Sequence, residues 1–86
     1  MTLLDAAYAL DELAAGRIPD RARLLAGAQA LDRVRVEATH ADRDLLDAAA
    51  ELHGAVKGVL DLSENGRARS QVLAAAVRRR CHTARY

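Results

Sequence analysis

The chain has 86 residues, of which 51% are hydrophobic, 29% charged and only 2% aromatic, and its formal net charge is +1. A chain of this length forms one domain, and its single core gives only marginal stability. Much of the apolar content is alanine, which removes little surface from water per residue. We therefore expect a homo-oligomer, most simply a dimer, in which a partner subunit helps to bury apolar surface.

The cysteine content and the N-terminal segment narrow the class of protein further. Cys81 is the single cysteine, which excludes a disulfide within the chain and a zinc site built on repeated cysteines. Asp5, Asp11 and Glu12 stand where a secretory signal would be basic or apolar, and no run approaches about 18 apolar residues. We expect a cytoplasmic protein with no membrane contact and no cofactor.

The first helix is expected over residues 2–15. Thr2, with Asp5 three residues later, fits a capping box that has Asp in place of the usual Glu. Gly16 can adopt the left-handed conformation that ends many helices. One face of this helix is apolar, because it carries Leu3, Ala7, Leu10 and Ala14.

Residues 19–62 carry a heptad repeat, the pattern of a helix that buries one seam. Pro19 and Asp20 suit a first helical turn, so the segment is expected to begin near residue 19. Two lines of residues at seven-residue intervals define the seam: Leu24, Leu31, Ala38, Leu45, Leu52 and Val59 on one line, and Gly27, Val34, Ala41, Ala48, Ala55 and Leu62 on the next. We expect this seam to be the buried face.

Two arrangements of residues 19–62 fit the pattern. The unchanged phase of the heptad, and the absence of glycine and proline between Gly27 and Gly54, favour one long helix. The alternative is two helices separated near Thr39, where Asp42 three residues later would complete a second capping box. Either arrangement gives a long heptad-patterned central segment.

The last helix is expected over residues 67–82. The sequence Ser63-Glu64-Asn65-Gly66 indicates a break before it, because Asn-Gly readily adopts positive φ and Ser or Asn can cap a following helix. The predicted fold is therefore all-α, with three or four helices and shorter flanking helices packed back on the central segment. The apolar face of the last helix would hold Val72, Leu73, Ala76 and Val77.

The charges are distributed unevenly along the chain. Residues 1–64 hold seven basic and twelve acidic side chains, a net charge of −5, whereas residues 65–86 hold six arginines and no acid, a net charge of +6. Such an asymmetry is typical of an interaction end. The arginines can pair with the acidic part of the chain itself, with an acidic partner or with nucleic-acid phosphates. The candidate contact residues are Arg67, Arg69, Arg78, Arg79 and Arg80.

A second candidate surface is an acidic stripe on the central segment. It consists of His40, Asp44, Asp47 and Glu51. Their spacings of four, three and four residues place them on one face of a helix. We interpret the stripe as a solvated face, or as a contact for a basic partner such as the arginine-rich end of a neighbouring subunit.

Few residues have a spacing that catalysis or metal binding requires. Glu37 and His40 have the Glu-x-x-His spacing of metal-binding bundles, but a dinuclear site needs two such copies and two further carboxylates. A dimer could supply the second copy, but we interpret the pair as surface polarity and expect no metal. His53 with Lys57 resembles the histidine and lysine of helical phosphotransfer domains. In those domains the lysine follows the histidine by three residues, whereas Lys57 follows His53 by four. The arginines before Cys81 would favour its thiolate, but no base or second thiol is placed nearby, so we interpret Cys81 as an incidental cysteine near the end of the last helix. We therefore expect no enzymatic activity.

Residues 60–65, with arginines and an apolar helix after them, are similar to the turn of helix-turn-helix DNA readers. That motif prefers a glycine at Asp61, a small residue at Lys57 and an apolar residue at Arg67, so we assign no family. The sequence favours a non-enzymatic helical module for protein–protein interaction, a dimeric adaptor or regulator. A DNA-binding regulator that uses the arginine-rich C-terminal helix is the alternative.

Overall fold

The described part of the chain, residues 2–37 and 43–83 of a computed structural model, contains four α-helices joined by connections. These residues contain no strand. The all-α class and the version of the prediction with four helices are therefore confirmed. The helices are α1 (Leu3–Ala14), α2 (Arg21–Glu37), α3 (Arg43–Val56) and α4 (Glu64–Thr83).

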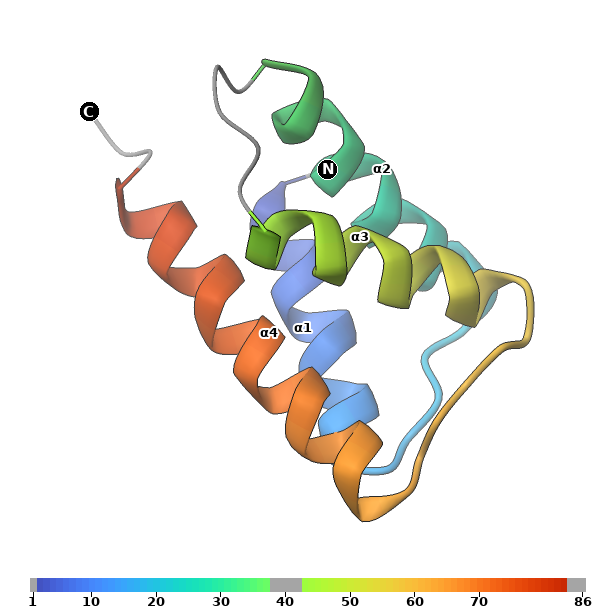
Figure 1. Cartoon of the computed structure of the whole chain (residues 1–86). Coiled ribbons are helices and arrows are strands. Elements are labelled where there is room, and N and C mark those ends of the chain that lie inside the picture. The colour runs from blue at the N-terminus through green and yellow to red at the C-terminus, as the bar shows by residue number, and fades with distance from the viewer. Residues whose placement is uncertain (1, 38–42, 84–86) are drawn as a thin grey trace.

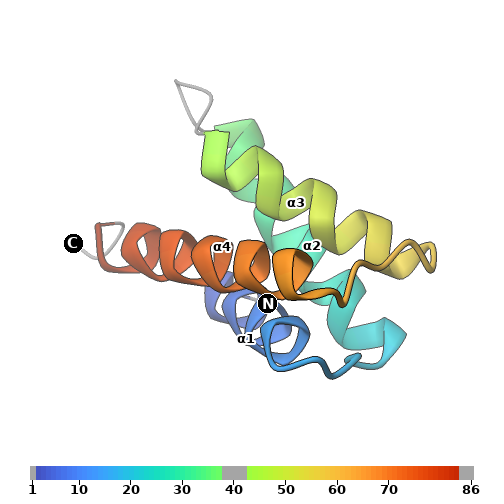
Figure 2. The same ribbon diagram turned by 60° about the horizontal axis from the view of Figure 1, so that its bottom comes forward.

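The helices are arranged as two antiparallel pairs that pack against each other (Figure 1). α1 and α4 run side by side in opposite directions, and α2 and α3 form the second pair (Figure 2). α1 also packs against α2, and α3 packs against α4. With 20 residues, α4 is the longest of the four and not a short flanking helix. The two flanking helices thus pair with each other as well as with the central segment.

Residues 19–62 do not form one continuous helix. α2 ends at Glu37, α3 begins at Arg43, and the two helices pack against each other. Thr39 and Asp42, at which the alternative arrangement predicts a break and a second capping box, lie outside the described residues. A single long helix would leave much of its seam in solvent, whereas two packed helices cover each other's seams. Four of the five leucines of the seam are buried in one core, namely Leu24, Leu31, Leu45 and Leu52, and Leu62 is half-buried against it.

Side chains and a glycine define the ends of the first helices as the sequence indicated. The Asp5 carboxylate accepts a hydrogen bond from the Thr2 backbone N–H at 2.8 Å, as expected for a capping box. Gly16 follows α1 with a φ of 79°, the left-handed conformation predicted there. The Asp20 carboxylate accepts a hydrogen bond from the Arg23 N–H at 2.9 Å. Asp20 is therefore the N-cap of α2, so Pro19 and Asp20 lie before the helix and not in its first turn.

Small residues let three helices approach closely at the centre of the core. A Cβ atom added to Gly27 of α2 would lie 3.0 Å from the Ala6 Cα of α1 and 3.0 Å from the Leu52 Cδ1 of α3. A larger residue at this position would force its neighbours to move. The largest fully buried apolar side chains are Leu10, Leu13, Leu31, Leu45, Leu52 and Val77.

The connection between α3 and α4 differs from the prediction. Residues 57–63 are not helical, and Gly58 has a φ of 86°. Val59, expected on the buried seam, lies in this connection and is 73% exposed. α4 begins at Glu64, so the Asn65-Gly66 dipeptide lies in its first turn and not in a break before residue 67.

Candidate functional site

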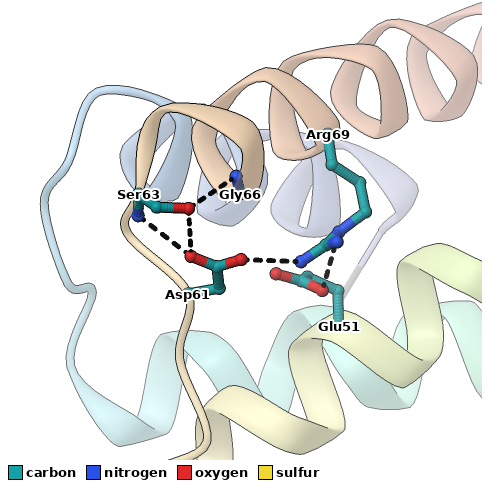
Figure 3. A network of polar contacts seen from close by, with 5 residues as sticks. All are labelled: Glu51, Asp61, Ser63, Gly66 and Arg69. Carbon is teal, nitrogen blue, oxygen red and sulfur yellow. Dashed lines mark hydrogen bonds and ion pairs between the residues drawn. The ribbon is translucent and has the colours of Figure 1, made fainter.

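A polar network organises the N-terminus of α4 (Figure 3). The Ser63 hydroxyl oxygen accepts a hydrogen bond from the Gly66 N–H at 3.2 Å, which makes Ser63 the N-cap of the helix. The Asp61 carboxylate accepts hydrogen bonds from the Ser63 N–H at 3.0 Å and from the Ser63 hydroxyl at 2.5 Å. Asp61 and Ser63 together fix the path by which the chain enters α4.

Gly66 belongs to this network because it has no side chain. A Cβ atom at this position would lie 2.1 Å from the Asp61 carbonyl oxygen and 2.6 Å from the Asp61 Cγ. Among the described glycines, positive φ values occur at Gly16 and Gly58 and not at Gly66. The glycine is therefore required by the close approach of the Asp61 backbone, and not by the turn conformation that Asn-Gly suggested.

Arg69 connects the network to α3. Its Nε atom lies 3.6 Å from Glu51 Oε2, and its Nη2 atom lies 3.6 Å from Asp61 Oδ2 (Figure 3). The hydrogen bonds from the Ser63 hydroxyl and backbone lower the pKa of Asp61, and the positive charge of Arg69 acts in the same direction. An arginine proposed to contact a partner thus lies between two carboxylates of its own chain.

Arg78 is held against α1. Its two terminal nitrogens donate hydrogen bonds to the two carboxylate oxygens of Asp11, one of them at 2.9 Å. The guanidinium carbon also lies 5.8 Å from the centre of the Tyr8 ring, within the range of a cation–π contact. The hydrogen bonds to Asp11 raise the pKa of Arg78. Arg78 therefore joins α4 to α1.

The other candidate arginines on α4 are placed differently. Arg67 and Arg79 are exposed, and Arg80 is half-buried. The structure thus brings Arg69 and Arg78 into ion pairs with carboxylates of the same chain and places Arg67 and Arg79 on the surface.

The acidic stripe is described in part. His40 lies outside the described residues, whereas Asp44, Asp47 and Glu51 lie on α3. The Arg43 Nε atom is 3.3 Å from a carboxylate oxygen of Asp47, an ion pair between two exposed side chains of the same helix. Glu51 is half-buried and faces α4 through its ion pair, so the stripe does not form one uniformly exposed surface.

A polar contact that sequence reasoning missed joins α2 and α3. The His53 Nε2 atom lies 2.8 Å from a carboxylate oxygen of Asp32, and both residues are half-buried. The two residues are 21 positions apart and come together because α2 and α3 are antiparallel neighbours. No local spacing signals such a pair, because its formation depends on how the central segment folds back.

Cys81 does not have the environment of a reactive thiolate. It is half-buried near the C-terminal end of α4. Burial raises the pKa of its thiol, and this effect exceeds the opposite effect of the Arg78 charge. The arginine charge therefore acts in the expected direction, but desolvation outweighs it.

Two further properties of the described part of the chain concern clusters of metal-ligating side chains and helices able to cross a membrane. Over residues 2–37 and 43–83, no cluster of three or more His, Cys, Asp or Glu residues could hold a metal ion. Within the same ranges, no helix combines the length and hydropathy needed to cross a membrane. The Glu37-x-x-His40 spacing stays a sequence observation, because His40 lies outside these ranges.

Large apolar side chains are exposed on the pair formed by α1 and α4. Leu4 and Tyr8, one turn apart on α1, are 43% and 51% exposed, and Val72 on α4 is 62% exposed. The prediction that Val72 belongs to the buried face of the last helix is wrong, because α4 packs on its neighbours through the adjacent face. Two further exposed residues, Ile18 and Val59, lie in connections between helices.

Neither a protein-family model, nor a curated protein, nor a solved structure matches this chain. Its function is therefore inferred from its own residues.

Proposed function

We propose that this protein is a non-enzymatic helical module for protein–protein interaction, a dimeric adaptor or regulator. The supporting observation is the exposure of Leu4, Tyr8 and Val72 on α1 and α4, two helices that lie side by side. Covering such side chains with a partner favours association by about 25 cal/mol per Å² of apolar area buried.

A protein partner fits this surface better than a small ligand. The exposed residues lie on the outer sides of two adjacent helices, whereas small-ligand sites are concave and enclose most of the ligand. Aromatic residues such as Tyr8 are enriched at the centres of protein interfaces. The ion pair of Asp11 and Arg78, next to the Tyr8 ring, would supply polar atoms for the edge of the same contact.

Affinity capture with chemical cross-linking tests this surface. We expect the wild type to retain a partner that is lost in the double variant Leu4→Lys/Tyr8→Lys, because two charges would be placed in an apolar contact. The matched control is Ile18→Lys, since Ile18 is 59% exposed but lies between α1 and α2. Circular dichroism should be unchanged in all variants. Retention of the same partner by the double variant would contradict the proposed surface.

We propose DNA binding by α4 as a second candidate function. The observation that favours it is the exposure of Arg67 and Arg79 on a helix that has no acidic residue after Glu64. Neutralisation of phosphates by such residues makes affinity fall steeply as salt concentration rises.

A gel shift with duplex DNA at low and high salt tests the DNA proposal. The double variant Arg67→Ala/Arg79→Ala should weaken binding to every sequence, because phosphate contacts carry no sequence information. Arg78→Ala is a suitable comparison, since Arg78 is already engaged by Asp11. Absence of a complex at micromolar protein and low salt would exclude this function.

A further inference from the structure

One side of α4 has no partner among the described residues. α4 packs on α1 and α3, and the opposite side faces away from the other helices along its length (Figure 1). Exposed residues at spacings of four, four, three and four positions form a continuous stripe on this side. This outer stripe consists of Glu64, Ala68, Val72, Ala75 and Arg79.

The outer stripe has side chains of similar size at equal distances from its midpoint. Its two ends carry opposite charges. Glu64 and Arg79 are equally far in sequence from the point between Gln71 and Val72, and so are the two alanines of the stripe. A twofold axis at this point would place Glu64 of each copy opposite Arg79 of the other and pair alanine with alanine. The stripe is thus complementary to a second copy of itself.

We infer that α4 pairs in antiparallel orientation with α4 of a second copy of this chain, and that two Glu64–Arg79 ion pairs fix the register. The inference rests on the proposed function, because it names the second copy as the partner of a dimeric module. Val72, which is 62% exposed in the single chain, would be buried next to the twofold axis. The alanines on either side of it would allow the two helices to approach closely.

The charges of the stripe also select against other arrangements. A parallel pair in register would place Glu64 beside Glu64 and Arg79 beside Arg79, and like charges at close range are unfavourable. The antiparallel arrangement also places the positive N-terminal end of each helix near the negative C-terminal end of the other. Arg69 and Arg78, which lie outside the stripe, are engaged by carboxylates of their own chain and do not compete for Glu64.

Charge reversal in the full chain tests the register. The variants Glu64→Arg and Arg79→Glu are measured alone and as an equimolar mixture by size-exclusion chromatography with light scattering. Each variant alone should dimerise about tenfold more weakly or worse, because its own pairing has two like-charge contacts. In the mixture each reversed residue faces an opposite charge, so dimer should return as a heterodimer of the two variants. Arg33→Glu, an exposed reversal on α2, is the control and should dimerise as the wild type does.

The outcomes distinguish this inference from the proposed function. Restoration of dimer in the mixture, with unchanged circular dichroism of each variant, supports the antiparallel pairing. A wild-type dimer that neither reversal weakens overturns the pairing but leaves a dimeric module with another interface. A wild type that is monomeric at tens of micromolar overturns the pairing, and capture of another protein through Leu4 and Tyr8 would still support the interaction module. A monomer that shifts DNA through Arg67 and Arg79 overturns the pairing in favour of the nucleic-acid function.

Discussion

The guanidinium of Arg78 donates two hydrogen bonds to the carboxylate of Asp11, which joins residues 67 positions apart in the sequence. The contact links α4 to α1 and places the cation near the ring of Tyr8. The two side chains are 38% and 43% exposed, so solvent screens the pair. Its contribution to stability is accordingly modest, and its main effect is to fix how the two helices meet.

We expect Arg78→Ala and Asp11→Ala each to lower the free energy of unfolding by about 0.5–1 kcal/mol. Arg78→Ala should have the larger effect, because it also removes the contact with Tyr8. Urea denaturation of both variants and of the double variant measures the coupling between them. Strictly additive effects of the two changes would show that the ion pair itself contributes nothing.

Gly66→Ala should be among the most destabilising single-methyl changes in the chain. Its Cβ would lie 2.1 Å from the Asp61 carbonyl oxygen, so the backbone at the start of α4 would have to move. We expect a loss of about 2–4 kcal/mol in the free energy of unfolding, measured by urea or thermal denaturation.

Gly54→Ala is the matched control for this change. Gly54 lies within α3, and its added Cβ would be 3.5 Å from the Val59 carbonyl oxygen, an ordinary van der Waals contact. Because alanine is favoured over glycine in helices, the variant should be neutral or more stable by up to about 1 kcal/mol. Equal effects of the two alanine substitutions would contradict the close approach at Gly66.

The lowered pKa of Asp61 makes the start of α4 sensitive to acid. Hydrogen bonds from Ser63 lower this pKa in the folded chain, so the folded state binds a proton less readily than the unfolded state. The stabilising contribution is therefore complete above the unfolded pKa of about 4 and is lost as the pH falls through the lower folded value. The difference in stability between the wild type and Asp61→Asn should shrink between pH 6 and pH 3, as measured by urea denaturation. A difference that does not depend on pH would show that Asp61 keeps its ordinary pKa.

Burial of Cys81 predicts a slow thiol. Because burial raises its pKa, the fraction of thiolate at neutral pH should be lower than that of a free cysteine. A disulfide reagent such as dithionitrobenzoate should react more slowly with the folded protein than with the protein in urea. A folded-state rate equal to that of a small free thiol would contradict the buried environment.

Features that depend on residues close in sequence could be predicted from the sequence. Thr2 with Asp5 and Gly16 act within a few residues, and the structure confirms the ends of α1 that they indicate. Ser63 caps the last helix, as a serine can, but that helix begins at Glu64 and not at residue 67. Four leucines of the seven-residue repeat enter the core, whereas Val59 of the same repeat is exposed. Such signals are local because caps and turns use hydrogen bonds between near neighbours.

Features that depend on how helices meet could not be predicted in the same way. A seven-residue repeat keeps the same phase whether its apolar seam packs on another protein, on a flanking helix or on the other half of the same segment. The repeat therefore does not distinguish one long helix from the helix pair α2 and α3. The same holds for the candidate site. The ion pair of Arg78 with Asp11 joins residues far apart in the sequence. The contact of His53 with Asp32 does so too, and neither can be recognised from a local spacing. The sequence around Gly66 indicated only a turn. The close approach of Asp61 to Gly66 could not be predicted, because it depends on the path of the connection before α4.

The pairing of α1 with α4 also affects the order in which the fold can be assembled during synthesis. The face of α1 that α4 covers has no cover until residues 15–63 and then α4 have been made. At typical translation rates of about 5–20 residues per second, this interval lasts several seconds, far longer than a helix needs to form. In that time the alanine- and leucine-rich face of α1 is open to chaperones or to other nascent chains. Of the four helices, α1 therefore waits longest between its own synthesis and its full enclosure.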